Sequence, residues 1–171
     1  MAGVVGAELK QKALTALILG IIAIFLYTTW RFETAFAAGA IVALVHDVLI
    51  SLGIFALLGR ELSLPMVGAI LAVAGYSIND TIVIFDRIRE YFRGGVGGDR
   101  AGVMNTAINQ TLSRTLLTSG LTFLAVLVLF LFGGRVINDF ALILLIGIVV
   151  GTYSSIFIAS PIVLLFGKTK S

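Results

Sequence analysis

Long apolar stretches separated by short polar segments dominate the pattern of this chain. Five stretches are long enough to cross a bilayer as helices, which takes about 20 mostly apolar residues each. Their expected bounds are about 13–30, 34–58, 64–86, 114–133 and 139–166. The first stretch does not fit a cleaved signal peptide, because it is too long and ends at Trp30 and Arg31 instead of at small residues. The pattern predicts an all-α membrane protein, a bundle of five transmembrane helices in a single transmembrane domain, 1–171.

Composition supports a membrane protein and removes several classes of site. Hydrophobic residues make up 59% of the chain and charged residues 12%, whereas soluble domains carry about 25% charged residues. The absence of cysteine and the single histidine exclude disulfides and Cys-rich or His-rich metal centres. No GxSxG, HExxH or phosphate-binding loop motif is present, so we expect no enzyme, no metal site and no cofactor. The net charge of +3 comes mostly from loop residues, and we expect no nucleic acid among the partners.

Loop charge predicts the orientation of the helices. The longest connection, at about 87–113, lies on the same side as eight of the twelve basic residues. These eight are Arg31, Arg87, Arg89, Arg93, Arg100, Arg114, Lys168 and Lys170. Because cytoplasmic loops are rich in Lys and Arg, we expect this loop and the C-terminus in the cytoplasm and the N-terminus outside.

The long connection contains its own predicted helix. Gly94 to Gly98 form a flexible break, after which 100–111 has an amphipathic pattern with Asp99 as its N-cap. Its apolar side carries Val103, Ala107 and Ile108. We expect a short amphipathic helix lying at the cytoplasmic headgroups, in preference to a partner-binding helix.

One stretch, GYSINDTIVIFDRIRE at 75–90, places a carboxyl group inside an apolar helix. Asp80 lies six residues, or about 9 Å, from the charge cluster that begins at Asp86. Tyr76 and Ser77 share its helix face, and Asn79 stands beside them. A charge in this environment is costly and usually functional. The alternative is a neutral carboxyl that is hydrogen-bonded to Ser or Thr.

The fourth apolar stretch opens with a second set of polar residues. Thr111, Thr115, Thr118 and Thr122 recur at helical spacing, with Arg114 at the border of their face and Ser119 one residue beyond Thr118. These hydroxyls either pack helices together or serve a polar site. Arg114 is either a cation at the membrane edge or a partner that turns inward to keep Asp80 ionised.

Two further features lie inside apolar stretches. His46 and Asp47 stand near the middle of the second one, and a proton-relay role and a structural hydrogen bond to another helix both remain open. Gly147, Gly151 and Ser155 recur every four residues, a spacing that predicts close helix packing.

The order of these motifs carries a family resemblance. The chain resembles the SecF family, the smaller half of the SecD–SecF protein-export complex, over nearly its whole length. The matching motifs are VVGAEL at 4–9, RFE at 31–33, ALVHD at 43–47, GYSINDTIVIFDRIRE at 75–90, NQTLSRTLLTS at 109–119 and LFGG at 131–134.

The resemblance implies one half of an RND-superfamily transporter in a bacterial or archaeal cytoplasmic (inner) membrane, as a multi-pass protein. It implies that the proton gradient is used, with protons as the coupling ion, to assist preprotein translocation through the SecYEG channel. The implied partners are the SecD half, SecYEG, the preprotein and the lipid bilayer. Halves of this family have six membrane helices, so the chain resembles one that lacks its first helix and external domain.

The family also implies roles for individual residues. The positions that match Asp80 and Arg114 belong to its proton-pathway motifs, while a further aspartate comes from the SecD half. We place Asp47 in the same pathway and Ser77, Asn79, Thr111, Thr118 and Ser119 as its polar support. Two other functions remain open: a structural membrane module for subunit assembly, or half of another RND-type transporter. Contact between Asp80 and Arg114 would favour proton coupling, whereas Asp80 bonded only to hydroxyls would favour the structural module.

Overall fold

The computed structural model describes residues 2–60, 64–95 and 99–166, and within them it is built from helices without any strand. The elements in chain order are α1 (Ala2–Arg31), α2 (Thr34–Leu57), α3 (Leu64–Arg93), α4 (Arg100–Phe132), α5 (Gly134–Ser154), the π-helical turn η1 (Ser155–Ala159) and α6 (Ser160–Phe166). Within these residues, five helical stretches are long and apolar enough to cross a membrane, with η1 and α6 continuing α5 into the fifth. The predicted bundle of five transmembrane helices is therefore confirmed.

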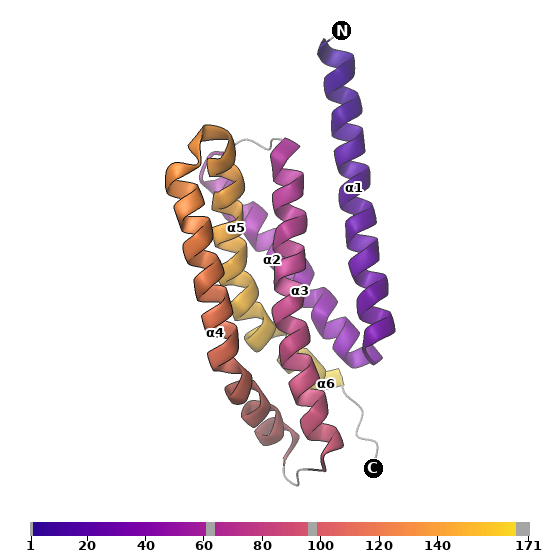
Figure 1. Cartoon of the computed structure of the whole chain (residues 1–171). Coiled ribbons are helices and arrows are strands. Elements are labelled where there is room, and N and C mark those ends of the chain that lie inside the picture. The colour runs from indigo at the N-terminus through magenta and orange to yellow at the C-terminus, as the bar shows by residue number, and fades with distance from the viewer. Residues whose placement is uncertain (1, 61–63, 96–98, 167–171) are drawn as a thin grey trace.

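Three helices, α3, α4 and α5, run side by side, and α2 crosses behind them at an angle (Figure 1). α5 occupies the centre, since it packs against α2, α3 and α4. α1 stands at the edge, where it contacts only α2 and α3 extensively. In the apolar segment of α3, 50% of the residues are buried, whereas in the apolar segment of α1 only 6% are buried. Ser77 and Asp80 of α3 are held inside the bundle, whereas α1 presents most of its surface outward.

Two glycines bring α5 close to α3. A Cβ atom added at Gly147 would lie 3.0 Å from Cβ of Val73, and one added at Gly151 would lie 3.1 Å from Cβ of Ser77. Any larger residue would therefore push the helices apart. Ser155, the third member of the predicted small-residue series, is buried at the start of η1.

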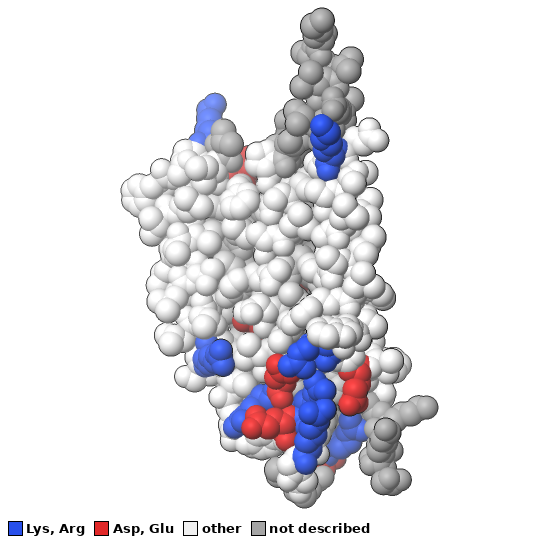
Figure 2. Space-filling model, turned by 45° about the vertical axis from the view of Figure 1, so that its right-hand side comes forward, with Lys and Arg blue, Asp and Glu red and all other residues white. Residues whose placement is uncertain are grey.

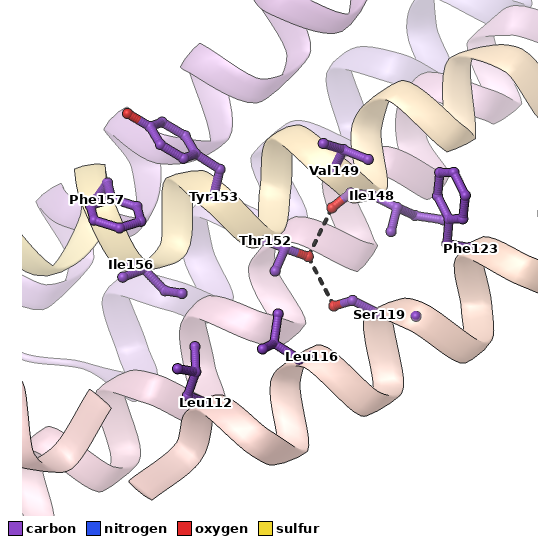
Figure 3. Close-up of a pocket in the computed structure, with 11 residues that line it drawn as sticks. Leu112, Leu116, Ser119, Phe123, Ile148, Val149, Thr152, Tyr153, Ile156 and Phe157 are labelled. Atoms are coloured by element: carbon purple, nitrogen blue, oxygen red, sulfur yellow. Dashed lines mark hydrogen bonds between the residues drawn. The ribbon is translucent and has the colours of Figure 1, made fainter. Parts of the chain in front are cut away.

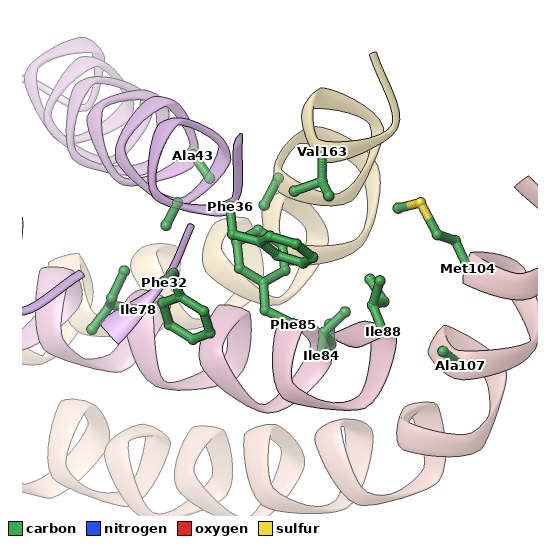
Figure 4. Packing of buried hydrophobic residues seen from close by; sticks show 12 residues of the cluster. Phe32, Phe36, Ala43, Ile78, Ile84, Phe85, Ile88, Met104, Ala107 and Val163 are labelled. Atoms are coloured by element: carbon green, nitrogen blue, oxygen red, sulfur yellow. The ribbon is translucent and has the colours of Figure 1, made fainter. Parts of the chain in front are cut away.

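An aromatic cluster fixes one end of the bundle. The Phe85 ring on α3 is fully buried and meets Phe32 and Phe36 edge-on, at centroid distances of 5.8 and 5.1 Å. Met104 from α4 and Val163 from α6 complete the cluster (Figure 4). Residues from the α1–α2 turn, α2, α3, α4 and α6 therefore share one packed core at this end.

The prediction of a separate interface helix at 100–111 is wrong. These residues form the first turns of a single helix, α4, that continues to Phe132. Val103 and Ala107 are buried, as predicted for the apolar side, but Ala107 packs in the core cluster of the bundle, together with Met104. The face continues through Thr111 at the same four-residue spacing, so nothing interrupts the helix where the predicted surface helix would end. Asp99 does occupy the N-cap position, without a side-chain capping bond.

Charged side chains gather towards the two ends of the bundle, with a mainly apolar band between them (Figure 2). At one end, both carboxylate oxygens of Asp86 accept hydrogen bonds from Arg31, at 2.9 and 3.0 Å. At the other end, Arg60 pairs with Asp139 at 2.8 Å. The end of α1 thus lies beside the charged end of α3, as the charge argument requires. Two of the counted basic residues, Lys168 and Lys170, lie outside the described residues.

Candidate functional site

Asp80 is buried and is held by hydroxyl groups from two other helices. Only 3% of the residue is exposed. Its Oδ2 accepts a hydrogen bond from Ser119 Oγ on α4 at 3.0 Å, and Thr152 Oγ1 on α5 lies 3.4 Å from the same oxygen. Thr152 Oγ1 is also 2.8 Å from Ser119 Oγ. A threonine hydroxyl has one hydrogen, so the shorter contacts make Ser119 the principal donor to Asp80.

The hydroxyl pair Ser119 and Thr152 borders a groove between α4 and α5. The groove has a volume of about 460 Å³ and is lined mainly by apolar side chains, with Gly120 leaving it open beside Ser119. Figure 3 shows Thr152 pointing from α5 towards Ser119 on α4, at the base of the groove. Asp80 is therefore separated from the outer surface of the bundle on this side by a pair of exchangeable hydroxyls.

A second buried carboxylate, Asp47, lies on the other side of the α3–α5 pair. It is fully buried, and its Oδ2 accepts hydrogen bonds from Ser77 on α3 and, at 2.6 Å, from Ser154 on α5. His46 Nδ1 lies 2.9 Å from Oδ1. Asp47 thus joins α2 to α3 and α5, just as Asp80 joins α3 to α4 and α5.

The expected contact between Asp80 and Arg114 is not formed. Arg114 is exposed, and among the described residues no hydrogen bond or ion pair joins it to Asp80. Ser119 directs its hydroxyl at Asp80, and Arg114 precedes it by five residues. At 100° and 1.5 Å per residue, Arg114 points about 140° away from Ser119 and lies about 7.5 Å closer to the N-terminal end of α4. This rotation explains why the guanidinium faces outward.

The polar face of α4 also differs from the expected one. The buried hydroxyl residues are Thr111, Thr115 and Ser119, at a uniform spacing of four. Thr118 lies outside this face, and its hydroxyl donates to the Arg114 carbonyl one turn back at 3.0 Å. Thr122 likewise donates to the Thr118 carbonyl, at 2.8 Å. A hydroxyl that is bonded to its own helix needs no partner helix, so spacing alone placed these threonines wrongly.

Two other residues that were predicted to support Asp80 do not lie beside it. Ser77 serves Asp47 instead of standing with Asp80, and Asn79 is exposed. Thr152 and Ser154 were missed by sequence reasoning, although the run TYSS in an otherwise apolar helix was the available signal. Within the described part of the chain, no group of three His, Asp or Glu side chains suits a metal ion.

Comparisons with known proteins agree on one family. The family model "Protein export membrane protein SecD/SecF, C-terminal" matches residues 1–169. The protein translocase subunit SecF of Desulfurispirillum indicum is 54% identical over 159 residues, which are 91% of this chain and 51% of that protein. The subunit of the same name from Escherichia coli O157:H7 is 47% identical over 97% of this chain and 51% of that protein. The chain thus spans about half the length of these curated relatives.

A solved structure supports the same assignment. The crystal structure of SecDF from Thermus thermophilus, described as a translocon-associated membrane protein, superposes with a TM-score of 0.89 at 46% identity. The superposition covers 95% of this chain and 22% of that one. The five-helix bundle and both of its buried carboxylates therefore belong to a member of the SecD/SecF protein-export membrane protein family, in the part that corresponds to the C-terminal family model.

Proposed function

We propose that this chain is the membrane part of a SecF-type subunit that uses the proton gradient to assist preprotein translocation. The observation that carries the proposal is the burial of Asp80, an ionisable carboxyl group inside an apolar bundle. Ionisable groups at such depth are costly, and in membrane proteins they mark ion and proton pathways. The names of the relatives support translocation as the process served.

Protonation of Asp80 changes the bond between α3 and α4. The ionised carboxylate accepts a charge-assisted bond from Ser119, which is roughly twice as strong as the bond to a neutral carboxyl. Uptake of a proton therefore loosens α3 from α4, and its release tightens them. Arg114 faces outward in this structure and takes no part in the bond between Ser119 and Asp80. The change of charge on Asp80 shifts the equilibrium between two conformations, and these conformations differ in the packing of the helices.

The proposal includes partners and an orientation. A SecD-type half packs beside the bundle and supplies the rest of the proton path, and the pair acts on a preprotein that passes through a SecYEG-type channel. The similarity to SecDF, in which both halves occur, supports the first of these partners. The bundle lies in the cytoplasmic (inner) membrane with the α3–α4 connection inside the cell, an orientation supported by the arginines gathered at that end.

A structural membrane module is the second candidate. It is favoured by the hydroxyl-only contacts of Asp80 and by the outward position of Arg114. In this case Asp80 joins helices and supports subunit assembly without a change in protonation. Membership of the SecD/SecF family leaves no support for the third alternative, half of an RND-type transporter of another kind.

Export driven by a proton gradient separates the two candidates. Asp80→Asn and Arg114→Lys are introduced into the full-length subunit in its complex, and export is measured with and without the gradient, together with thermal stability. Proton coupling predicts loss of the gradient-dependent part of export in both variants at near-normal stability. The structural module predicts that Asp80→Asn lowers stability and all export together. Asp139→Asn, the same chemical change in the exposed pair with Arg60, is the matched control. Normal gradient-dependent export in both test variants would refute proton coupling.

A further inference from the structure

Asp47 is a buried carboxylate that the coupling step at Asp80 does not use. It lies near the middle of α2, with none of its surface exposed. A residue that only joined helices would need no ionisable group, because an amide or a hydroxyl makes similar bonds without the cost of a buried charge. We therefore ask whether the groups bonded to Asp47 can deliver a proton to it.

The hydrogen bonds around Asp47 suit both of its protonation states. When Asp47 is ionised, His46 Nδ1–H donates to Oδ1, and Ser77 and Ser154 donate to Oδ2. When Asp47 carries a proton on Oδ1, that proton is donated to an unprotonated Nδ1, and Oδ2 still accepts as a carbonyl oxygen. No contact has to break when the proton number changes. The site can therefore gain or lose a proton without losing its hydrogen bonds.

His46 is the member of the pair that reaches the outside of the bundle. Its side chain is 32% exposed, whereas the side chain of Asp47 is 0% exposed. The imidazole ring therefore spans from the buried carboxylate to the surface, with Nδ1 on Asp47 and Nε2 as its second proton-binding atom. A base at the surface of this chain is thus bonded to a buried acid, which is the geometry of a proton shuttle where that surface meets water or a proton-carrying partner subunit and not lipid.

Among the described residues, no other ionisable side chain is bonded to Asp47. From α3, Tyr76 has a buried hydroxyl without a hydrogen-bond partner, and Asp80 is held by α4 and α5. From α1, Arg31 pairs with Asp86, and Tyr27 is exposed. From α5, Asp139 pairs with Arg60 at the end of the bundle and Tyr153 stacks on Phe157. The described residues of η1 and α6 contain no ionisable side chain.

We propose that His46 and Asp47 form a second proton-binding site, on the α2 side of the α3–α5 pair, with His46 as the shuttle. A proton binds Nε2 of His46, the Nδ1 proton passes to Oδ1 of Asp47, and the ring is left as the neutral Nε2–H tautomer. Release reverses these two transfers, so one proton enters and one leaves. The inference rests on the proposed function only in that a proton gradient supplies the protons.

Protonation of this site also has a mechanical consequence. Neutral Asp47 holds Ser77 and Ser154 by weaker bonds than ionised Asp47 does. The link from α2 to α3 and α5 therefore loosens when the proton binds. Space for a replacement contact is limited, because a Cβ atom at Gly151 would already lie 3.6 Å from Asp47 Oδ2. The second site thus controls a helix contact that Asp80 does not reach.

Infrared difference spectroscopy tests the inference directly. The complete complex is shifted between low and high pH, and the carbonyl stretch of protonated carboxyl groups is recorded with and without Asp47→Asn. The expected result is one band that disappears in Asp47→Asn and persists in Asp80→Asn. His46→Gln keeps the band but slows its appearance roughly a hundredfold after a pH jump, as expected for loss of a positioned acid–base group. Ser51→Ala, which removes another buried hydroxyl on α2 that has no partner, is the control and leaves band and rate unchanged.

The outcomes separate this inference from the proposed function. A pH-dependent band for Asp80 without one for Asp47 overturns the second site and leaves coupling at Asp80 intact. A band for Asp47 whose rate is unaffected by His46→Gln overturns the shuttle. Bands for neither carboxylate overturn both proposals. If Asp47→Asn prevents assembly of the complex, the rate measurement on His46→Gln and the Asp80→Asn spectrum still decide the question.

Discussion

Replacement of Gly147 by alanine tests how α5 is held against α3. The added Cβ would lie 3.0 Å from Cβ of Val73 and 2.6 Å from its Cγ1. Carbon atoms in favourable contact are about 3.5–4.0 Å apart. A change of the Val73 rotamer moves Cγ1 but leaves the contact between the two Cβ atoms, whose positions are set by the backbones. The helices must therefore separate by roughly 0.5–1 Å at this level.

The expected cost follows from the overlap and from helix propensity. Overpacking of this size destabilises by about 1–3 kcal/mol, while glycine-to-alanine in a helix gains up to about 1 kcal/mol. Gly75→Ala isolates the overlap, because a Cβ atom at Gly75 meets nothing within 4 Å. The difference in unfolding free energy between Gly147→Ala and Gly75→Ala should thus be about 1–3 kcal/mol.

Thermal unfolding of the purified complex in detergent measures the difference. Adding Val73→Ala to Gly147→Ala removes the Cγ1 contact and leaves the Cβ contact, so the double variant should recover part of the loss. The coupling between the two substitutions should reach at least about 0.5 kcal/mol. Equal stability of Gly147→Ala and Gly75→Ala, or simple additivity with Val73→Ala, would refute the close packing of α5 on α3 at this level.

Three further substitutions test other contacts by thermal unfolding. Ser119→Ala removes the 3.0 Å donor of Asp80 and should cost about 1–3 kcal/mol; no loss would mean that this hydroxyl does not hold the carboxyl. Arg31→Gln breaks a half-exposed pair with Asp86 and should cost no more than about 1 kcal/mol, with a smaller loss at high salt; a salt-independent loss would contradict an electrostatic contact. Phe85→Ala empties the centre of the aromatic cluster and should cost about 3 kcal/mol, the lower end for soluble cores, because lipid also solvates the ring; a loss below that of Arg31→Gln would contradict a packed core.

The number of helices was predictable because apolar length is a direct requirement of the bilayer. Backbone groups in lipid must be bonded within their own segment, so each long apolar stretch has one available structure. The start of α4 was less predictable, because an amphipathic pattern allows more than one environment. The amphipathic pattern at 100–111 fits a helix on a membrane surface and a helix against protein equally well. Met104 and Ala107 lie in one buried cluster with Phe85 and Ile88 of α3, so the apolar side packs against protein, a choice that depends on tertiary packing.

The buried carboxylates were identifiable from sequence, whereas their partners were not. Asp47 and Asp80 stand out because a charge inside an apolar helix is rare. Their partners depend on the rotation of each neighbouring helix, and one residue along a helix changes its direction by 100°. Ser119 faces Asp80 and Thr118, the position before it, bonds to its own helix. A spacing pattern of threonines cannot resolve that difference, since Ser and Thr fit either role.

The position of α5 explains how one bundle holds two carboxylates apart. Thr152 and Ser154 are two residues apart, so their side chains point about 160° away from each other around α5. One therefore lies beside Asp80 on the α4 side, and the other bonds Asp47 on the α2 side. The π-helical turn begins at the next residue, Ser155, and such turns often occur at functional sites. A shift or rotation of α5 changes both sets of bonds at once. The two proposed protonation events, on opposite sides of the bundle, would therefore act on one helix and would need no direct contact between the carboxylates to influence each other.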